Sequence, residues 1–287
     1  MNSETTPTAP ETPAFKIDFG AIYSRALDIF KPKLQFFLVA TLLVIAAMIA
    51  ISIVYGITAA IIGLIFGLGK VTVLKFIGAL IGLVLGFAAT VAFMLVGAGM
   101  MRAFLPAIRG GAGNFEDLYT FYKDHSLLKQ LLIYAGIYAA ISLVSSLVNL
   151  LLVSILPIKV ALTLMGLFGL VFSLAMCAFL VLTAFALPLI LDKKMEAIAA
   201  LKLSYEQVLR DPVMIIIFIV VNGIVGLIGS IALGIGVVVT IPFATIAFLC
   251  VYEGIFNGAL PAAPALPAAP PEAPAPPAEQ PPQPPAA

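Results

Sequence analysis

The sequence predicts an all-α protein that crosses a membrane six times as a polytopic helical bundle. Of its 287 residues, 62% are hydrophobic and only 10% are charged, and the mean hydropathy is +1.17. Soluble domains are about half apolar and about a quarter charged. The apolar residues also fall into long runs separated by short polar stretches, and a transmembrane helix needs about 20 such residues. We therefore expect an integral membrane protein.

Polar interruptions divide the chain into the six predicted spans. The apolar runs cover residues 34–69, 76–105, 127–156, 160–191 and 213–256. The last run is about twice the length of one span, and Gly-Ile-Gly at 234–236 is a suitable place for its reversal. The first run would form a straight helix of about 54 Å, longer than one hydrocarbon core. The sequence leaves open whether it is one long helix or is broken near its glycines.

The basic residues indicate which side of the membrane each polar segment occupies. With six spans, only Lys70, Lys75 and Lys159 fall on one side. The basic residues on the other side are Lys16, Arg25, Lys31, Lys33, Arg102, Arg109, Lys123, Lys129, Lys193, Lys194, Lys202 and Arg210. Cytoplasmic segments carry an excess of Lys and Arg. We therefore expect a multi-pass protein of the cell inner (plasma) membrane with both termini in the cytoplasm.

The chain is expected to contain three repeated units between two disordered ends. The predicted segments are 1–15, a disordered N-terminus; 16–108, 109–191 and 192–259, the three repeats; and 260–287, a disordered Pro-rich tail. Each repeat is predicted to be a hairpin of two spans preceded by a cytoplasmic amphipathic helix. The predicted apolar faces are Phe19, Ile22, Tyr23, Ala26 and Phe30; Phe115, Leu118 and Tyr122; and Ile198, Leu201, Tyr205 and Val208.

A Leu-Pro pair marks the end of the second span in each unit, at 105–106, 187–188 and 260–261. The second pair is followed by Asp192, Lys193 and Lys194. We interpret Asp192 as the cap of the amphipathic helix that follows, and the two lysines as residues that keep the loop in the cytoplasm.

Two segments of the chain resemble a known family. Ala-Leu-Pro-Leu-Ile-Leu-Asp-Lys-Lys-Met-Glu-Ala-Ile-Ala-Ala-Leu-Lys-Leu-Ser-Tyr at 186–205 and Asp-Phe-Gly-Ala-Ile-Tyr-Ser-Arg-Ala-Leu-Asp-Ile-Phe-Lys at 18–31 are similar to bacterial six-span proteins related to the membrane domain of glycerophosphoryl diester phosphodiesterase. The resemblance implies a bacterial membrane protein. It implies no activity, because the phosphodiesterase chemistry of that family resides in a separate soluble domain that this sequence lacks.

Four polar residues are candidates for an intramembrane role. Glu253 has apolar sequence on both sides, and a carboxylate within a span is costly unless it is paired. We interpret it as the partner of Arg102, which ends the second span at a comparable depth, and keep a proton- or ion-coupling role as the alternative. Asn149 and Asn222 lie deeper and are the residues that would line a solute pathway.

Glycines at a spacing of four residues predict close helix packing. Gly78, Gly82 and Gly86 share one face of the second span, and Gly63 and Gly67 lie near the end of the first. Small residues at this spacing allow two helices to approach closely. A dedicated contact between copies of the chain is the alternative, and the sequence does not determine the oligomeric state.

No catalytic, cofactor-binding or metal-binding motif is found in the sequence. It contains one histidine, His125, and lacks HExxH, Walker, GxSxG and CxxC patterns. Cys177 and Cys250 are isolated within apolar runs and are interpreted as packing residues. We therefore expect neither enzyme activity nor a cofactor.

The C-terminal tail is the remaining feature with a functional interpretation. Residues 261–287 are rich in proline and should form an extended arm. The segment contains no Lys or Arg to orient a Pro-rich ligand, so a spacer or weak docking arm is expected. The leading hypothesis is a non-enzymatic factor that organises membrane lipids or docks a cytoplasmic protein through this tail. The alternative is a transporter or channel for a small or hydrophobic solute, and no nucleic-acid binding is expected.

Overall fold

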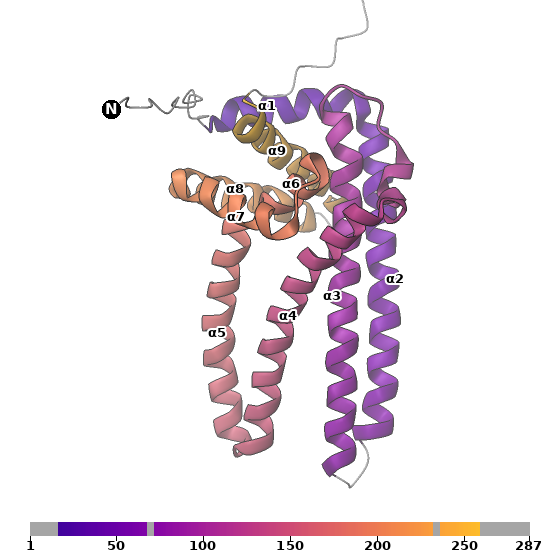
Figure 1. Ribbon diagram of the computed structural model, residues 1–287, viewed down its shortest axis with the longest axis vertical. Coiled ribbons are helices and arrows are strands. Elements are labelled where there is room, and N and C mark those ends of the chain that lie inside the picture. The colour runs from indigo at the N-terminus through magenta and orange to yellow at the C-terminus, as the bar shows by residue number, and fades with distance from the viewer. Residues whose placement is uncertain (1–16, 68–71, 232–235, 259–287) are drawn as a thin grey trace, which may run out of the picture.

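The computed structural model describes residues 17–67, 72–231 and 236–258 (Figure 1). In this part of the chain all regular elements are helical. They are α1 (Phe19–Phe30), η1 (Lys31–Lys33), α2 (Leu34–Gly67), α3 (Thr72–Ile108), η2 (Phe115–Leu118), η3 (Thr120–Lys123), α4 (His125–Ile155), α5 (Ile158–Leu182), α6 (Ala186–Lys193), α7 (Ala197–Arg210), α8 (Pro212–Ile231) and α9 (Val237–Asn257). Six helical segments are long and apolar enough to cross a membrane. The predicted all-α class and the number of candidate spans are confirmed.

The packed core lies at one end of the molecule, where α1, α6 and α7 gather (Figure 1). We call this end the core layer. It consists of α1, α6 and α7 with α2 up to Val44, α3 from Ala98, α4 up to Ala139, and the packed parts of α8 and α9. Its largest buried side chains include Phe37, Phe104, Phe185, Phe218 and Tyr252.

The first apolar run forms one continuous helix of 34 residues, α2. Its buried residues lie near its start, at Phe37, Ala40, Thr41 and Val44. Beyond Val44 the helix leaves the core layer, and the remaining residues 45–67 extend for about 34 Å at 1.5 Å per residue. This length matches a hydrocarbon core of about 30 Å. The long run is therefore one candidate span with an added segment that packs in the core layer.

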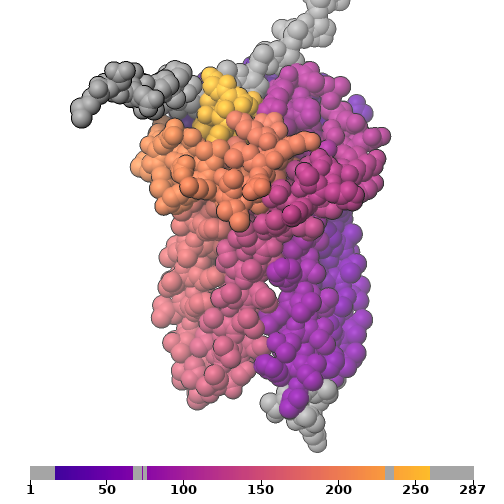
Figure 2. All heavy atoms as spheres, viewed as in Figure 1, coloured from indigo at the N-terminus to yellow at the C-terminus, as the bar shows by residue number. Residues whose placement is uncertain are grey.

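The distal halves of α2, α3, α4 and α5 expose apolar side chains. Examples are Val54 on α2, Val84 on α3 and Ile155 on α4, each more than 60% exposed. In Figure 2 the end farthest from α1 is formed by these four helices, whereas α8 and α9 lie near the core layer (Figure 1). A continuous exposed apolar surface over several helices is typical of contact with lipid or with another protein.

The second predicted amphipathic helix has a different local structure. Residues 115–123 form two short 3-10 turns, η2 and η3, in place of an α-helix. Asn114 caps η2, since its side chain accepts a hydrogen bond from the backbone of Glu116 at 3.0 Å. The backbone of Leu118 lies so close to Gly99 of α3 that a side chain at Gly99 would collide with it. Close backbone packing thus fixes η2 against α3.

The third predicted amphipathic helix is α7, but only part of its predicted apolar face, Leu201 and Val208, packs on the protein. Its buried residues are Ala197, Ala200, Ser204 and Val208. Ile198 and Tyr205 of the predicted apolar face are 70% and 46% exposed. The packed side of α7 thus combines three small residues with Val208, while Ile198 and Tyr205 of the predicted face remain exposed. On α1, Ile22, Ala26 and Phe30 of the predicted face are buried.

Some predictions lie outside the described residues. They are the N-terminal segment 1–15, the Pro-rich tail 260–287 and most of the reversal at 234–236.

Candidate functional site

The most extensive polar cluster in the described part of the chain joins Arg109, Asp192 and Glu253. Arg109 donates from Nη1 to Asp192 Oδ1 at 2.6 Å and from Nη2 to Asp192 Oδ2 at 2.8 Å. Its Nε donates to Glu253 Oε1 at 2.8 Å. One guanidinium thus bridges two carboxylates in the geometry that gives Arg its strongest ion pairs. We call these three residues the ion cluster.

Further hydrogen bonds satisfy the carboxylates of the ion cluster. The Tyr252 hydroxyl donates to Asp192 Oδ2 at 2.9 Å, and Asn257 Nδ2 donates to Glu253 Oε2 at 2.7 Å. The Glu253 and Asp192 side chains are only 7% and 13% exposed. The hydrogen bond to Asp192 is the main cause that raises the pKa of Arg109 above its ordinary value. Both carboxylates of the ion cluster are paired with the Arg109 guanidinium. This arrangement is suited to holding the three residues' chain segments together.

The ion cluster joins the ends of three helices that are far apart in the sequence. Arg109 follows α3 directly, Asp192 belongs to α6 and Glu253 belongs to α9. By the predicted bounds, Arg109 is the first residue of the second repeat, whereas Asp192 and Glu253 belong to the third. The prediction that Glu253 pairs with Arg102 is wrong, because its partner is Arg109, seven residues farther along. Arg109 lies just past the apolar run, where it can approach both carboxylates, and the sequence does not indicate this.

Asp192 also differs from its predicted role. The residue that precedes α7 is Glu196, and Asp192 lies within the last turn of α6. Its carboxylate accepts hydrogen bonds from Arg109 and Tyr252 and does not cap α7. The one sequence feature that relates Arg109 to Asp192 is that each residue follows a Leu-Pro pair by a few positions.

Two lysines, Lys33 and Lys194, make further contacts between chain segments at the edge of the core layer. Lys33 donates from Nζ to the carbonyl oxygens of Ala107 and Gly111, at 2.7 Å each, and so caps the C-terminal end of α3. A cation at this end also interacts favourably with the helix dipole. Lys194 Nζ lies 3.2 Å from Asp124 Oδ2. A hydrogen bond from the Leu127 backbone, and then Lys194, lowers the pKa of Asp124 below its ordinary value.

Asn149 bonds within its own helix, Asn222 bonds to α9 and accepts a hydrogen bond from the Tyr23 hydroxyl of α1 at 3.5 Å, and neither shares a site with Glu253. Asn149 donates to the carbonyl oxygen of Ser145 on its own helix at 3.0 Å. Asn222 donates to the carbonyl oxygen of Ala244 at 3.0 Å and so joins α8 to α9. Asn222 also lines an apolar cavity of about 580 Å³ that includes residues of α5, α8 and α9. In the described residues these side chains therefore do not form a common polar pathway.

Arg102 belongs to a second set of buried polar groups. Its Nη1 atom is buried and has no hydrogen-bond partner among the described residues, and the same is true of Arg25 Nε and Thr41 Oγ1. Thr41 is fully buried. Helical threonines such as Thr90 and Thr245 bond instead to the carbonyl four residues earlier.

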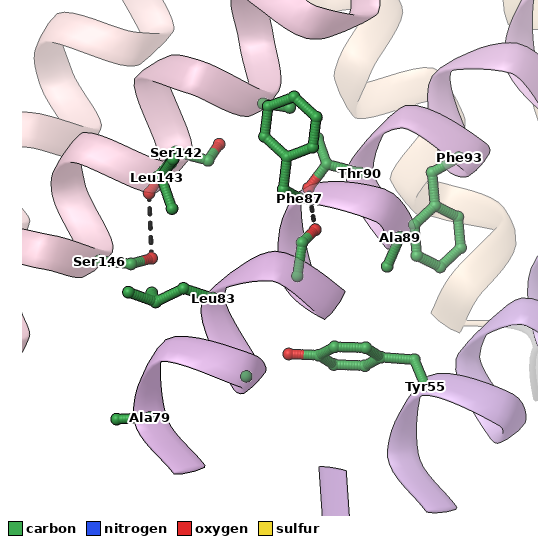
Figure 3. A pocket seen from close by; sticks show the side chains of 13 residues that line it. Tyr55, Ala79, Leu83, Phe87, Ala89, Thr90, Phe93, Ser142, Leu143 and Ser146 are labelled. Atoms are coloured by element: carbon green, nitrogen blue, oxygen red, sulfur yellow. Dashed lines mark hydrogen bonds between the residues drawn. The ribbon is translucent and has the colours of Figure 1, made fainter. Parts of the chain in front are cut away.

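A second candidate site is a cavity of about 440 Å³ between α2, α3 and α4. We call it the interhelical cavity. Figure 3 shows Tyr55 of α2 facing α3, with Ser142 and Ser146 on the α4 side. Gly82, Gly86 and Thr90 contribute the α3 wall. Its lining side chains are apolar or carry uncharged hydroxyls, so it suits an uncharged molecule.

The predicted glycines have different environments. A Cβ atom on Gly78 would lie 2.5 Å from Phe66 Cβ, so α2 and α3 pack closely there. Gly82 and Gly63 have no atom within 4 Å of such a Cβ, and Gly67 is the last residue of α2. A Cβ atom on Gly86 would lie 3.8 Å from the Tyr55 hydroxyl oxygen, which is an ordinary contact distance. Helices α2 and α3 therefore pack closely at Gly78, whereas Gly82 and Gly86 line the interhelical cavity.

Among the described residues, no group of three or more His, Cys, Asp and Glu side chains is placed to hold a metal ion. Cys250 is buried and Cys177 is exposed, and both are free thiols. Comparison of the chain with known protein families, curated proteins and solved structures finds no match.

Proposed function

We propose that this protein is a non-enzymatic membrane protein that organises lipids and docks a partner protein at the cytoplasmic face of the inner membrane. The observation that carries the proposal is the division of the molecule into two parts. One end is a packed layer held by the ion cluster, and the other consists of helices with exposed apolar side chains. A packed layer beside an exposed apolar surface is suited to holding a partner at the membrane.

The proposed topology has three hairpins, α2–α3, α4–α5 and α8–α9, with both termini in the cytoplasm. In support, the helices of each pair are in contact. Lys33 contacts Gly111, Arg109 contacts Asp192 and Lys194 contacts Asp124, so the basic segments lie at one end. Lys159, in the first turn of α5, belongs to the other end. This grouping agrees with the excess of basic residues expected on the cytoplasmic side.

We propose that α7 and the turns η2 and η3 lie at the membrane surface. α7 exposes Ile198, Tyr205 and Leu209 beside its packed face, and Tyr119 and Tyr122 are each 51% exposed. Aromatic side chains are enriched at membrane interfaces, and an apolar helix face can lie in the headgroup region. These exposed groups would anchor the core layer on the lipid surface.

We assign partner docking to the core layer together with the Pro-rich segment 261–287. Extended Pro-rich segments bind aromatic-lined grooves with little loss of conformational entropy, because they are already extended. Without Lys or Arg to fix its direction, this segment would act as a weak arm, with the core layer supplying the main contact.

Native purification in lipid nanodiscs followed by mass spectrometry tests the proposal. We expect the full chain to retain a defined partner protein, and a chain without residues 261–287 to retain less of it. Arg109→Gln should also lose partner, whereas Lys202→Gln, which alters an exposed 3.9 Å pair with Glu206, should not. Equal partner recovery from all four proteins, or no partner with any of them, would contradict the proposed docking role.

A further inference from the structure

The interhelical cavity exists because glycines occupy the α3 wall. Gly82 has open space where a side chain would project, and Gly86 faces Tyr55 across the gap between α2 and α3. At Gly78, four residues before Gly82 in α3, the same two helices are in close contact, because Phe66 of α2 lies against Gly78. The α2–α3 pair is therefore closed toward its distal end and open beside α4. A glycine stripe that usually promotes helix contact here leaves room for another molecule.

The cavity lies within the lipid-facing half of the protein. The core layer begins on α3 at Ala98, and Gly86 is twelve residues before it, which corresponds to about 18 Å along the helix axis. That distance is close to the middle of a hydrocarbon core of about 30 Å. Phe87 and Tyr55 are 36% and 40% exposed, so the cavity is accessible from the surface that lipid would contact.

Hydroxyl groups at the cavity offer both hydrogen-bond donor and acceptor capacity. Thr90 donates its proton to the Gly86 carbonyl at 2.9 Å, and Ser146 donates its proton to the Ser142 carbonyl at 3.0 Å. Each keeps acceptor capacity on its hydroxyl oxygen. The Tyr55 hydroxyl has no hydrogen-bond partner among the residues that the structure describes, and Figure 3 shows it pointing toward α3. It is available as a donor.

From this arrangement we propose that the interhelical cavity binds an uncharged lipid with a free hydroxyl group. An alcohol both donates and accepts, so it can pair with Tyr55 and with Thr90 or Ser146. A carboxylate or phosphate would require a cation, and the residues that line the cavity include none. The volume of about 440 Å³ is within the range of small-molecule sites and leaves room for a hydrocarbon chain. Binding requires the packing of α2, α3 and α4 and does not involve the ion cluster.

The test uses 1-hexadecanol with a diazirine in its chain, and the matching alkane without the hydroxyl. The full-length protein is reconstituted in phosphatidylcholine vesicles and irradiated, and labelled peptides are mapped. We expect hexadecanol labelling to concentrate on residues 79–93 and 139–146. Gly82→Leu should remove most of it by filling the cavity, whereas Gly56→Leu should not. Gly56 also has open space at its Cβ but does not line the cavity.

Two further variants keep the test independent of folding defects. Ser142→Leu fills the cavity from the α4 side and should reproduce the loss if Gly82→Leu proves unstable. Tyr55→Phe should raise the concentration of unlabelled hexadecanol needed for half competition about five-fold, the effect of one hydrogen bond, and leave alkane labelling unchanged. Labelling spread evenly over the lipid-facing helices, or unchanged in both filled variants, would overturn the proposed site. An unchanged competition curve for Tyr55→Phe would overturn its preference for a hydroxyl.

Discussion

Arg109 and Asp192 are 83 residues apart in the sequence and form a two-pronged ion pair, with nitrogen–oxygen distances of 2.6 and 2.8 Å. The same guanidinium holds Glu253 of α9. Three chain segments that leave the apolar region at different points are thus fixed to one another by a single side chain. The stability of the core layer should depend on this residue more than on any exposed ion pair.

Replacing Arg109 with Gln should lower the free energy of unfolding in detergent by about 2–3 kcal/mol. Removing one partner of a buried ion pair leaves the other charges unpaired, and the 39% exposure of Arg109 keeps the loss below the upper range for such pairs. Thermal unfolding followed by circular dichroism measures the change. Lys202→Gln is the matched control, with an expected change under about 0.5 kcal/mol because its pair is exposed. Equal effects of the two substitutions would contradict a stabilising role for the cluster.

A double-mutant cycle should identify the partner of Glu253. Glu253→Gln and Arg109→Gln contact the same network, so their effects on stability should be non-additive by about 1–3 kcal/mol. Glu253→Gln and Arg102→Gln should add to within about 0.5 kcal/mol. Unfolding free energies of the single and double variants provide the comparison. Strong coupling to Arg102 and none to Arg109 would restore the pairing expected from the sequence.

Two alanine substitutions on the α2–α3 pair should have opposite effects. Gly78→Ala should destabilise the protein by about 1–3 kcal/mol, because the new methyl group would overlap Phe66. Gly63→Ala should be neutral or stabilise by up to about 1 kcal/mol, since it meets open space and alanine favours helix. Melting temperatures of the two variants distinguish these cases. Similar melting temperatures would mean that α2 and α3 do not pack closely at Gly78.

Acid should weaken the contact between Asp124 and Lys194. The folded-state pKa of Asp124 is lowered, so its contribution to stability is present above the unfolded pKa of about 4 and is lost as the pH falls through the folded value. The stability difference between the native chain and Asp124→Asn should therefore be greatest near pH 7 and shrink as the pH falls below about 4. Asparagine retains the helix cap and removes the charge. A difference that is constant between pH 7 and pH 3 would exclude a charged contribution.

The sequence was sufficient to predict the helical class and the six candidate spans, because hydrophobic length is a local property. It predicted the first run as residues 34–69, and the structure has a continuous helix to Gly67. It did not predict that the start of this helix, at Phe37 and Val44, packs among other helices. Hydrophobicity alone does not distinguish a protein neighbour from lipid.

The same ambiguity explains the errors in the candidate sites. On α7, Ile198 and Tyr205 had the expected spacing, but the smaller Ala197 and Ala200 allow closer packing and form the buried face. Glycine spacing predicted close packing equally at Gly78 and Gly82, although only Gly78 has a near neighbour. Glu253 was recognised as a residue in need of a partner, but the choice between Arg102 and Arg109 depends on how three helices end relative to one another.

The orientation of the core layer in the membrane tests the account most directly. Single cysteines at Lys202 and Lys159, in a chain with Cys177 and Cys250 replaced by alanine, would be treated with a membrane-impermeant maleimide in right-side-out and inverted vesicles. Both positions are exposed. Lys202→Cys should react only in inverted vesicles, and Lys159→Cys only in right-side-out vesicles. Reaction of both on the same side, or of Lys202→Cys from outside, would contradict a core layer that faces the cytoplasm.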